Sequence, residues 1–175
     1  KLGVDWLAVA IAQEGIELRK AGISITILVF GGVLQDQIQE FLDWDLEFTV
    51  SSLENLDWTE KTVQSIGKRA RVHLKIDTGM ERIGAPEYET RIFLPRAAKS
   101  DHLEINGIYS HLACADDPES QMTYEQLRRF NSAIEYFQEH SSKKPICHLA
   151  NSGGILHFPE TFLDMVRPGI ILYGV

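Results

Sequence analysis

The feature that most constrains the fold of this chain is a regular alternation of short apolar runs with longer amphipathic segments. The apolar runs predict strands over residues 4–10, 24–30, 46–50, 71–76, 105–112 and 146–149, with a last strand over 164–166 and 170–173, interrupted by Pro168-Gly169. The amphipathic segments predict helices over residues 13–20, 35–44, 53–66, 87–98 and 123–140, with at most one helical turn over 155–158. We expect Pro95 to break or kink the fourth of these helices.

Seven strands separated by helices indicate an α/β protein with a parallel sheet, and the continuous apolar character of the strands indicates that both faces are covered. An open doubly wound sheet and a TIM-type (β/α)8 barrel both fit this pattern. The barrel requires eight strands, so one would be missing. No linker divides the sequence, and residues 1–175 are expected to form a single, partial domain.

Charge and composition exclude several classes of partner. The net charge is −8 and the pI is near 5.2, which argues against nucleic acid or an anionic membrane. No apolar run approaches the roughly 20 residues that span a bilayer, and the chain opens without the pattern of a signal peptide. The cysteines, Cys114 and Cys147, fit a reducing, cytoplasmic location, and no Cys or His pair has the spacing of metal ligands. The abrupt start suggests a fragment of a longer protein.

The strongest functional signal lies in residues 75–84, Lys-Ile-Asp-Thr-Gly-Met-Glu-Arg-Ile-Gly. Lys75 lies inside an apolar strand, on the same face as His73, and Arg82 follows the Asp-Thr-Gly turn. Cationic groups at the end of a strand indicate an anion-binding site. The simpler alternative is a structural salt bridge between Lys75 and a carboxylate such as Asp77.

Three later segments add polar residues at strand ends. In the segment of residues 107–113, His111 lies at the end of the strand predicted over 105–112. His148, Asn151 and Ser152 lie in a turn that either binds phosphate through backbone N–H groups and the hydroxyl or simply caps a helix. Arg167 lies in an apolar run before Pro168-Gly169-Ile170. Barrels often bind phosphate in the loops after strands 7 and 8, where Ser152 and Gly169 would fall.

These four segments, together with residues 5–10, resemble the fold-type III, pyridoxal-phosphate-dependent alanine racemases over essentially the whole chain. The family has an N-terminal (β/α)8 barrel and a C-terminal β domain, and it acts as a homodimer. The resemblance therefore implies an isomerase that interconverts L- and D-alanine and supplies D-alanine for peptidoglycan in the cell wall. Its implied cofactor is pyridoxal 5'-phosphate, and its implied substrate is a small amino acid.

The resemblance also implies roles for individual residues. Arg82 would hold the substrate carboxylate and contact the phenolic oxygen of the cofactor, and Lys75 would be the lysine that many members carbamylate to orient that arginine. His111 and His148 would lie around the cofactor ring and its arginine. Arg167 would face the pyridine nitrogen, which would stay largely unprotonated because an arginine does not readily give up a proton. The implied phosphate-binding residues are Asn151, Ser152, Gly169 and Ile170.

The sequence also departs from the family pattern. The Schiff-base lysine belongs to a Lys-Ala-x-Ala-Tyr-Gly-His-Gly-like motif that does not occur here, and Lys1 is not that lysine. The catalytic tyrosine of the C-terminal domain is also missing from the sequence, which ends at Val175. Racemisation needs a base on each face of the α-carbon. We therefore expect this chain alone to be inactive and to lack covalent cofactor binding. Glu81 replaces a glycine that is usual in the family.

Three alternative functions remain open. A serine or broad-specificity amino acid racemase shares the same motifs. A non-catalytic pyridoxal-phosphate-binding barrel would lack the C-terminal β domain. A regulatory or structural barrel that has lost its lysine is disfavoured, because the other candidate site residues are retained.

Overall fold

The computed structural model describes residues 3–174. Lys1, which the resemblance excludes as the cofactor lysine, lies outside this range, as does Val175.

Six parallel strands form one sheet, in the order in which they occur in the chain. They are β1 (Trp6–Val9), β2 (Thr26–Val29), β3 (Glu47–Val50), β4 (Ala70–Lys75), β5 (Leu103–Tyr109) and β6 (Ile146–His148). A doubly wound sheet reverses its strand order at a switch point. The strictly sequential order here therefore excludes that alternative and confirms the barrel type, of which this chain forms a curled part.

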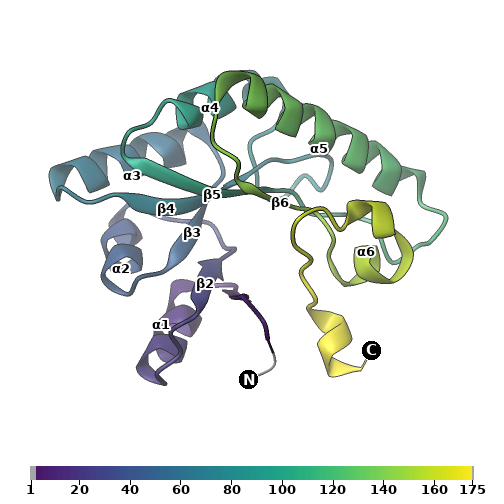
Figure 1. Ribbon diagram of the computed structural model, residues 1–175, viewed down its shortest axis with the longest axis horizontal. Helices are drawn as coiled ribbons and strands as arrows, with labels where there is room; N and C mark the ends of the chain where they lie inside the picture. Colours follow the sequence, from purple (N-terminus) through teal and green to yellow (C-terminus); the bar gives the residue numbers. More distant parts are fainter. Residues whose placement is uncertain (1–2, 175) are drawn as a thin grey trace.

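Helices connect the strands. They are α1 (Ala12–Lys20), α2 (Ile38–Asp43), α3 (Leu53–Ser65), α4 (Glu87–Ala98), α5 (Gln121–His140) and α6 (Ser152–His157), with short 3-10 turns η1 (Gln35–Gln37), η2 (Pro159–Thr161) and η3 (Ile170–Tyr173). Figure 1 shows the sheet curved into an arch, with α1 to α5 along its outer side and both ends of the described chain below it. None of the helices in residues 3–174 is both long and apolar enough to cross a membrane.

The two faces of the sheet differ in chemistry. The outer face packs against the helices through a buried apolar set: Ile27, Val29, Phe48, Val50, Val72, Leu74 and Ile108. Because side chains alternate along a strand, the intervening residues face the inside of the arch. Many of these are polar yet buried: Glu47, Thr49, His73, Lys75, Tyr109 and His148. A buried polar side chain needs a partner, so the concave face is where hydrogen-bonded chemistry is concentrated.

The predicted seventh strand is wrong. Residues 170–173 form the 3-10 turn η3 instead. The backbone N–H groups of Asp164 and Arg167 do donate to the carbonyls of Cys147, in β6, and of Ala150, just beyond it, at 3.0 Å each. Beyond Pro168, however, the Ser152 hydroxyl accepts the N–H of Gly169 at 3.0 Å and that of Ile171 at 3.4 Å. The Ser152 side chain thus accepts the N–H groups that would otherwise donate to a neighbouring strand, so no strand forms here.

The expected break at Pro95 does not occur either, and α4 continues to Ala98. Proline cannot donate to the carbonyl oxygen four residues earlier, that of Arg91. The hydroxyl of Tyr136, from α5, donates to this oxygen at 3.2 Å. A tertiary hydrogen bond therefore replaces the missing helical one.

Candidate active site

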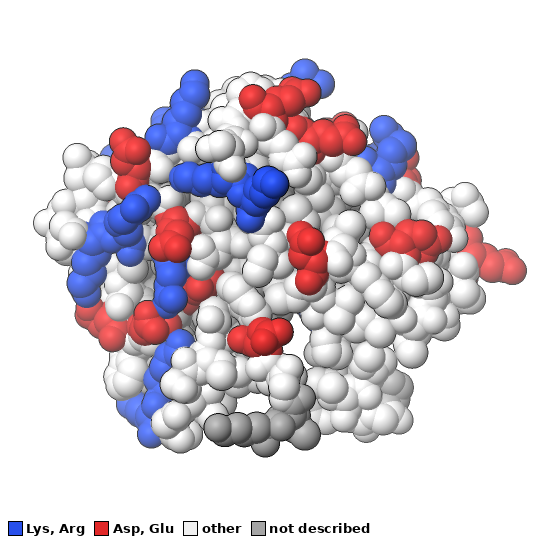
Figure 2. Space-filling view, in the orientation of Figure 1, with Lys and Arg blue, Asp and Glu red and all other residues white. Residues whose placement is uncertain are grey.

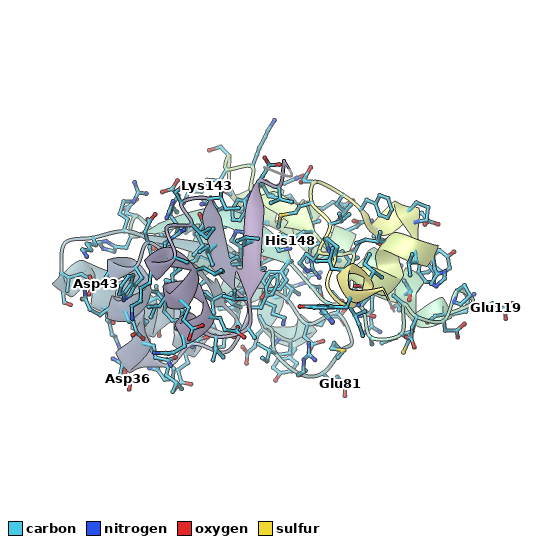
Figure 3. All side chains as sticks on the ribbon, turned by 90° about the horizontal axis from the view of Figure 1, so that it is seen from below. Asp36, Asp43, Glu81, Glu119, Lys143 and His148 are labelled. Carbon is cyan, nitrogen blue, oxygen red and sulfur yellow. The ribbon has the colours of Figure 1, made fainter. Side chains whose placement is uncertain are left out.

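The candidate residues gather where the parallel strands end. In Figure 3, Asp36 and Glu81, which follow β2 and β4, lie along the lower edge of the molecule, whereas Lys143, which precedes β6, lies on the opposite edge. Lys75 ends β4 and His148 ends β6. This is the edge at which (β/α) barrels carry their active sites.

Lys75 is buried, with 5% of its surface exposed. Its ammonium lies 5.3 Å from the centre of the Tyr109 ring, and no ion pair joins it to a carboxylate within residues 3–174. Burial, reinforced by the positive charges of Arg82 and Arg167, lowers the pKa of Lys75 to about 8. A neutral amine is therefore accessible near physiological pH, as carbamylation requires.

The carboxylate of Asp77 does not act as a salt-bridge partner for this lysine. It folds the following loop by accepting the backbone N–H groups of Gly79 at 2.8 Å and of Glu81 and Arg82 at 3.1 Å each. The structural alternative proposed from the sequence is therefore wrong. The loop holds Glu81 at a φ of 55°, in the left-handed region that glycine favours. Arg82 is exposed beside it.

His111 is partly buried just beyond β5. Burial lowers its pKa to about 4, and the positive charges of Arg167, Arg82 and Lys75 act in the same direction. The imidazole is thus neutral at pH 7. The chain as a whole has a net charge of −8. The surroundings of His111 are positive instead, because three basic side chains act on this histidine. Such a field attracts anions.

Arg167 is held by three acceptors. Its Nη2 donates to the carbonyl oxygens of Ser110 at 2.7 Å and Leu149 at 2.9 Å, and its Nη1 donates to Nδ1 of His148 at 2.9 Å. Burial lowers the pKa of Arg167 to about 10, so it remains charged at neutral pH. The guanidinium also lies 5.4 Å from the centre of the Tyr109 ring, an arrangement typical of cation–π contact.

The turn after β6 is built by its own side chains. Asn151 caps α6 by accepting the N–H of Gly154 at 3.0 Å, and its amide nitrogen donates to the carbonyl of Leu112 at 3.1 Å. Ser152 is buried, and its oxygen accepts the N–H groups of Gly169 and Ile171, which brings Ile170 to the same place. The serine oxygen still has its own proton to donate.

Sequence reasoning missed Tyr109 and Gln126. The Tyr109 ring stacks on that of His148, with centroids 4.7 Å apart and planes 6° apart, and underlies Lys75. Gln126, buried on α5, donates to the carbonyl of His111 at 2.9 Å and accepts the N–H of Ala113 at 2.9 Å. In the strand predicted over residues 105–112, Tyr109 lies two residues before His111 and therefore on the same face. This spacing could have identified Tyr109 as a site residue. Gln126 gives no such signal, because it lies on a helix remote in sequence.

The fold and site define a (β/α)-barrel protein with cationic side chains clustered at the carboxyl ends of its strands. The chain belongs to the family described as alanine racemase, N-terminal domain, whose model matches residues 1–175. This confirms the resemblance seen in the sequence.

Individual relatives agree. The chain is 41% identical to the alanine racemase of Methanococcus maripaludis over 99% of its own length and 47% of the relative's. The solved alanine racemase of Streptomyces lavendulae matches with a TM-score of 0.93 at 32% identity, over 99% of this chain and 46% of that one. The alanine racemase of Bartonella henselae, solved with covalently bound pyridoxal phosphate, matches with a TM-score of 0.87 at 26% identity, over 99% and 49%. The chain thus spans about half the length of the relatives it matches.

Proposed function

We propose that this chain is the barrel part of a cytoplasmic alanine racemase that interconverts L- and D-alanine for peptidoglycan synthesis. The observation that carries the proposal is the positive field of Arg82 and Arg167 at a neutral His111, beside the buried Lys75, in an otherwise acidic chain of this family. A zwitterionic amino acid and a phosphorylated cofactor both bring negative charge to such a site. Family membership supports the alanine racemase assignment.

Pyridoxal 5'-phosphate fits the donors that the structure offers. Ser152 has a hydroxyl proton to donate beside Gly169 and Ile170, where a phosphate would bind. Arg167 and His148 would lie against the ring, with His111 nearby. When bound, the cofactor serves as an electron sink that makes the α-proton of an amino acid acidic. The Bartonella henselae relative, solved with this cofactor, supports the proposal.

The chain's own residues would bind and orient the reactants. Arg82 would bind the substrate carboxylate, with Lys75, in carbamylated form, holding the arginine in place. Asn151 would shape the phosphate loop, because both ends of its amide already have partners. The two bases that racemisation requires would come from outside this sequence, so the chain by itself would not catalyse the reaction.

The region after α6 would contact the rest of the protein, including its second domain and the partner subunit of a homodimer. Exposed apolar side chains gather there: Phe162, Leu163, Val166, Ile170, Leu172 and Tyr173. Figure 2 shows charges of both signs over the helical side of the molecule and none over the part that η3 occupies. Surfaces of this kind are usually covered in the assembled protein.

The test is to purify the full-length protein that contains this chain and measure the change in optical rotation of L-alanine with added pyridoxal phosphate. The proposal expects racemisation by the full-length protein and none by residues 1–175 alone. Comparison of kcat/KM for alanine and serine decides between the alanine-specific enzyme and a serine or broad-specificity racemase. Pyridoxal phosphate binding without turnover would instead favour the non-catalytic barrel.

A further inference from the structure

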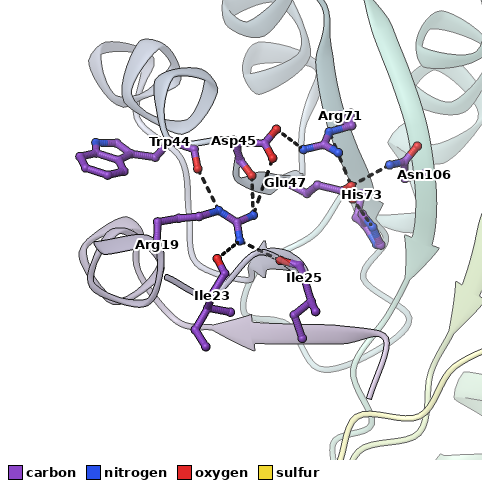
Figure 4. Close-up of polar contacts among 9 residues, drawn as sticks. All are labelled: Arg19, Ile23, Ile25, Trp44, Asp45, Glu47, Arg71, His73 and Asn106. Carbon is purple, nitrogen blue, oxygen red and sulfur yellow. Dashed lines mark hydrogen bonds and ion pairs between the residues drawn. The ribbon is translucent and has the colours of Figure 1, made fainter. Parts of the chain in front are cut away.

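A continuous line of buried polar side chains crosses the concave face of the sheet and ends at Arg167. Nδ1 of His148, which accepts from Arg167, belongs to a ring whose Nε2 lies 2.8 Å from Nδ1 of His73. Nε2 of His73 lies 3.1 Å from the carboxylate of Glu47. Both histidines are fully buried and Glu47 is 1% exposed. Figure 4 shows the Glu47 end of this line, where Asn106 and Arg71 also approach the carboxylate.

The position of each proton on this line follows from the chemistry of its ends. A guanidinium can only donate, so Nδ1 of His148 carries no proton. Burial, together with the positive charge of Arg167, lowers the pKa of His148 well below its usual value, so the ring is neutral and its one proton is on Nε2. That proton is donated to Nδ1 of His73, whose own proton must then be on Nε2, facing Glu47.

The carboxylate at the far end is the acceptor that this arrangement needs. Glu47 accepts from His73 at one oxygen and from the amide of Asn106 at the other, at 2.8 Å. Arg71 lies 3.7 Å from the second oxygen and balances its charge. The line is therefore directional: every hydrogen bond from Arg167 to Glu47 donates the same way. Hydrogen bonds in such a series polarise one another.

We propose that Glu47 is a positioning residue that acts through His73 and His148 to present a bare imidazole nitrogen to Arg167 and thereby fix the guanidinium. A guanidinium has five N–H groups, of which Arg167 uses three on His148, Ser110 and Leu149. Within residues 3–174 the other two, on Nε and Nη1, donate to no protein acceptor. In the racemase proposed above, on which this step rests, they are the groups available to a ligand.

Replacing the carboxylate by an amide provides a direct test. In Glu47→Gln the amide oxygen is expected to accept from Asn106, which turns the NH2 group toward His73. Nε2 of His73 must then accept, so its proton moves to Nδ1 and is donated to His148. The proton of His148 is displaced to Nδ1, where it meets the N–H of Arg167. Two facing donors cannot bond, and the guanidinium loses one of its three anchors.

The first measurement is neutron diffraction from deuterium-exchanged crystals of the full-length protein. The inference expects one deuteron on each ring, on Nε2 of both His73 and His148. A deuteron on Nδ1 of His148 overturns it. This measurement requires neither cofactor nor turnover. It can therefore contradict the inferred proton positions without contradicting the racemase proposal, and the racemase proposal can be wrong while the proton positions are right.

The second measurement is pyridoxal phosphate affinity, titrated by fluorescence, in three variants of the full-length protein. Glu47→Gln is expected to bind about tenfold more weakly, because one buried hydrogen bond is lost. Thr59→Val removes a buried hydroxyl on α3 that donates to the carbonyl of Asn55 at 2.7 Å, and it controls for lost stability without touching the line or Tyr109. Glu104→Gln removes an exposed carboxylate on β5 and is expected to bind as wild type does. Unchanged affinity in Glu47→Gln, or an equal loss in Thr59→Val at matched thermal stability, overturns the role of Glu47.

Discussion

The ammonium of Lys75 lies 5.3 Å from the centre of the Tyr109 ring and has no carboxylate counter-ion in the described part of the chain. Its pKa of about 8 means that the neutral amine, the form that reacts with carbon dioxide, becomes abundant between pH 7 and pH 9. We expect a carbamate signal in the 13C NMR spectrum of protein incubated with 13C-bicarbonate, increasing over this range.

The variant Lys75→Arg should abolish that signal, because a guanidinium is not carbamylated. The matched control is Lys68→Arg, which replaces a half-exposed lysine paired with Asp43. Persistence of the signal in Lys75→Arg would show that another amine carries the carbamate.

The low pKa of His111 makes stability depend on pH in a definite direction. The folded state holds its imidazole neutral down to about pH 4, whereas the unfolded chain binds a proton near pH 6.5. The unfolded state thus binds more protons between these values, so the free energy of unfolding falls as pH is lowered from 6.5 towards 4. The loss is on the order of 3 kcal/mol. Urea unfolding at several pH values should show it, and the fall should be smaller in His111→Asn, in which the buried His73 and His148, whose pKa values are also lowered, still contribute. A pH dependence unchanged in this variant would assign it to other groups.

Glu81 is strained by its left-handed backbone, with a φ of 55°. Glu81→Gly should stabilise the protein by roughly 0.5–1 kcal/mol, since the relief of strain exceeds the added flexibility of the unfolded chain. Glu81→Ala removes the same charge but keeps a Cβ, so it should give no such gain. Thermal unfolding of the two variants compares them directly. Equal stabilisation by both would attribute the effect to the charge.

Gly107 makes room for His73. A Cβ at this position would lie 2.1 Å from Nδ1 of His73, the atom that accepts from His148. We expect Gly107→Ala to destabilise the protein by about 3 kcal/mol, combining overpacking with a broken buried hydrogen bond. Gly32→Ala is the control, because nothing lies within 4 Å of its added Cβ. Chemical denaturation measures both variants, and a loss below about 1 kcal/mol for Gly107→Ala would mean that the sheet adjusts easily.

Tyr136 supports α4 through the Arg91 carbonyl that Pro95 leaves without a helical donor. Tyr136→Phe should cost about 1 kcal/mol, the usual net value of one hydrogen bond. Tyr88→Phe, at a side chain that is 80% exposed, should be neutral. Hydrogen exchange of the last turn of α4 adds a local readout, and unchanged protection there in Tyr136→Phe would argue against the bridging role.

The amino-acid sequence by itself determined the α/β class, the positions of six strands and the family. The class and the strand positions follow from local periodicity. The family follows from short motifs, such as residues 75–84, that can be read without knowing the tertiary structure. The last strand was predicted wrongly, and the break that was one of the two outcomes expected at Pro95 does not occur. In both segments a distant side chain, Ser152 or Tyr136, makes the hydrogen bond that decides the local structure.

Only the tertiary structure decided between the open sheet and the barrel, and only it excluded the salt bridge between Lys75 and Asp77. It also revealed the line from Arg167 to Glu47, whose members come from separate strands and a loop. The sequence shows that a glutamate, Glu47, lies in a largely apolar strand. It does not show which residue this glutamate contacts, because that depends on the register between neighbouring strands. The pairing of Thr49 with His73 and of Tyr109 with His148 places these residues side by side on one face, and register arises from packing across the whole sheet.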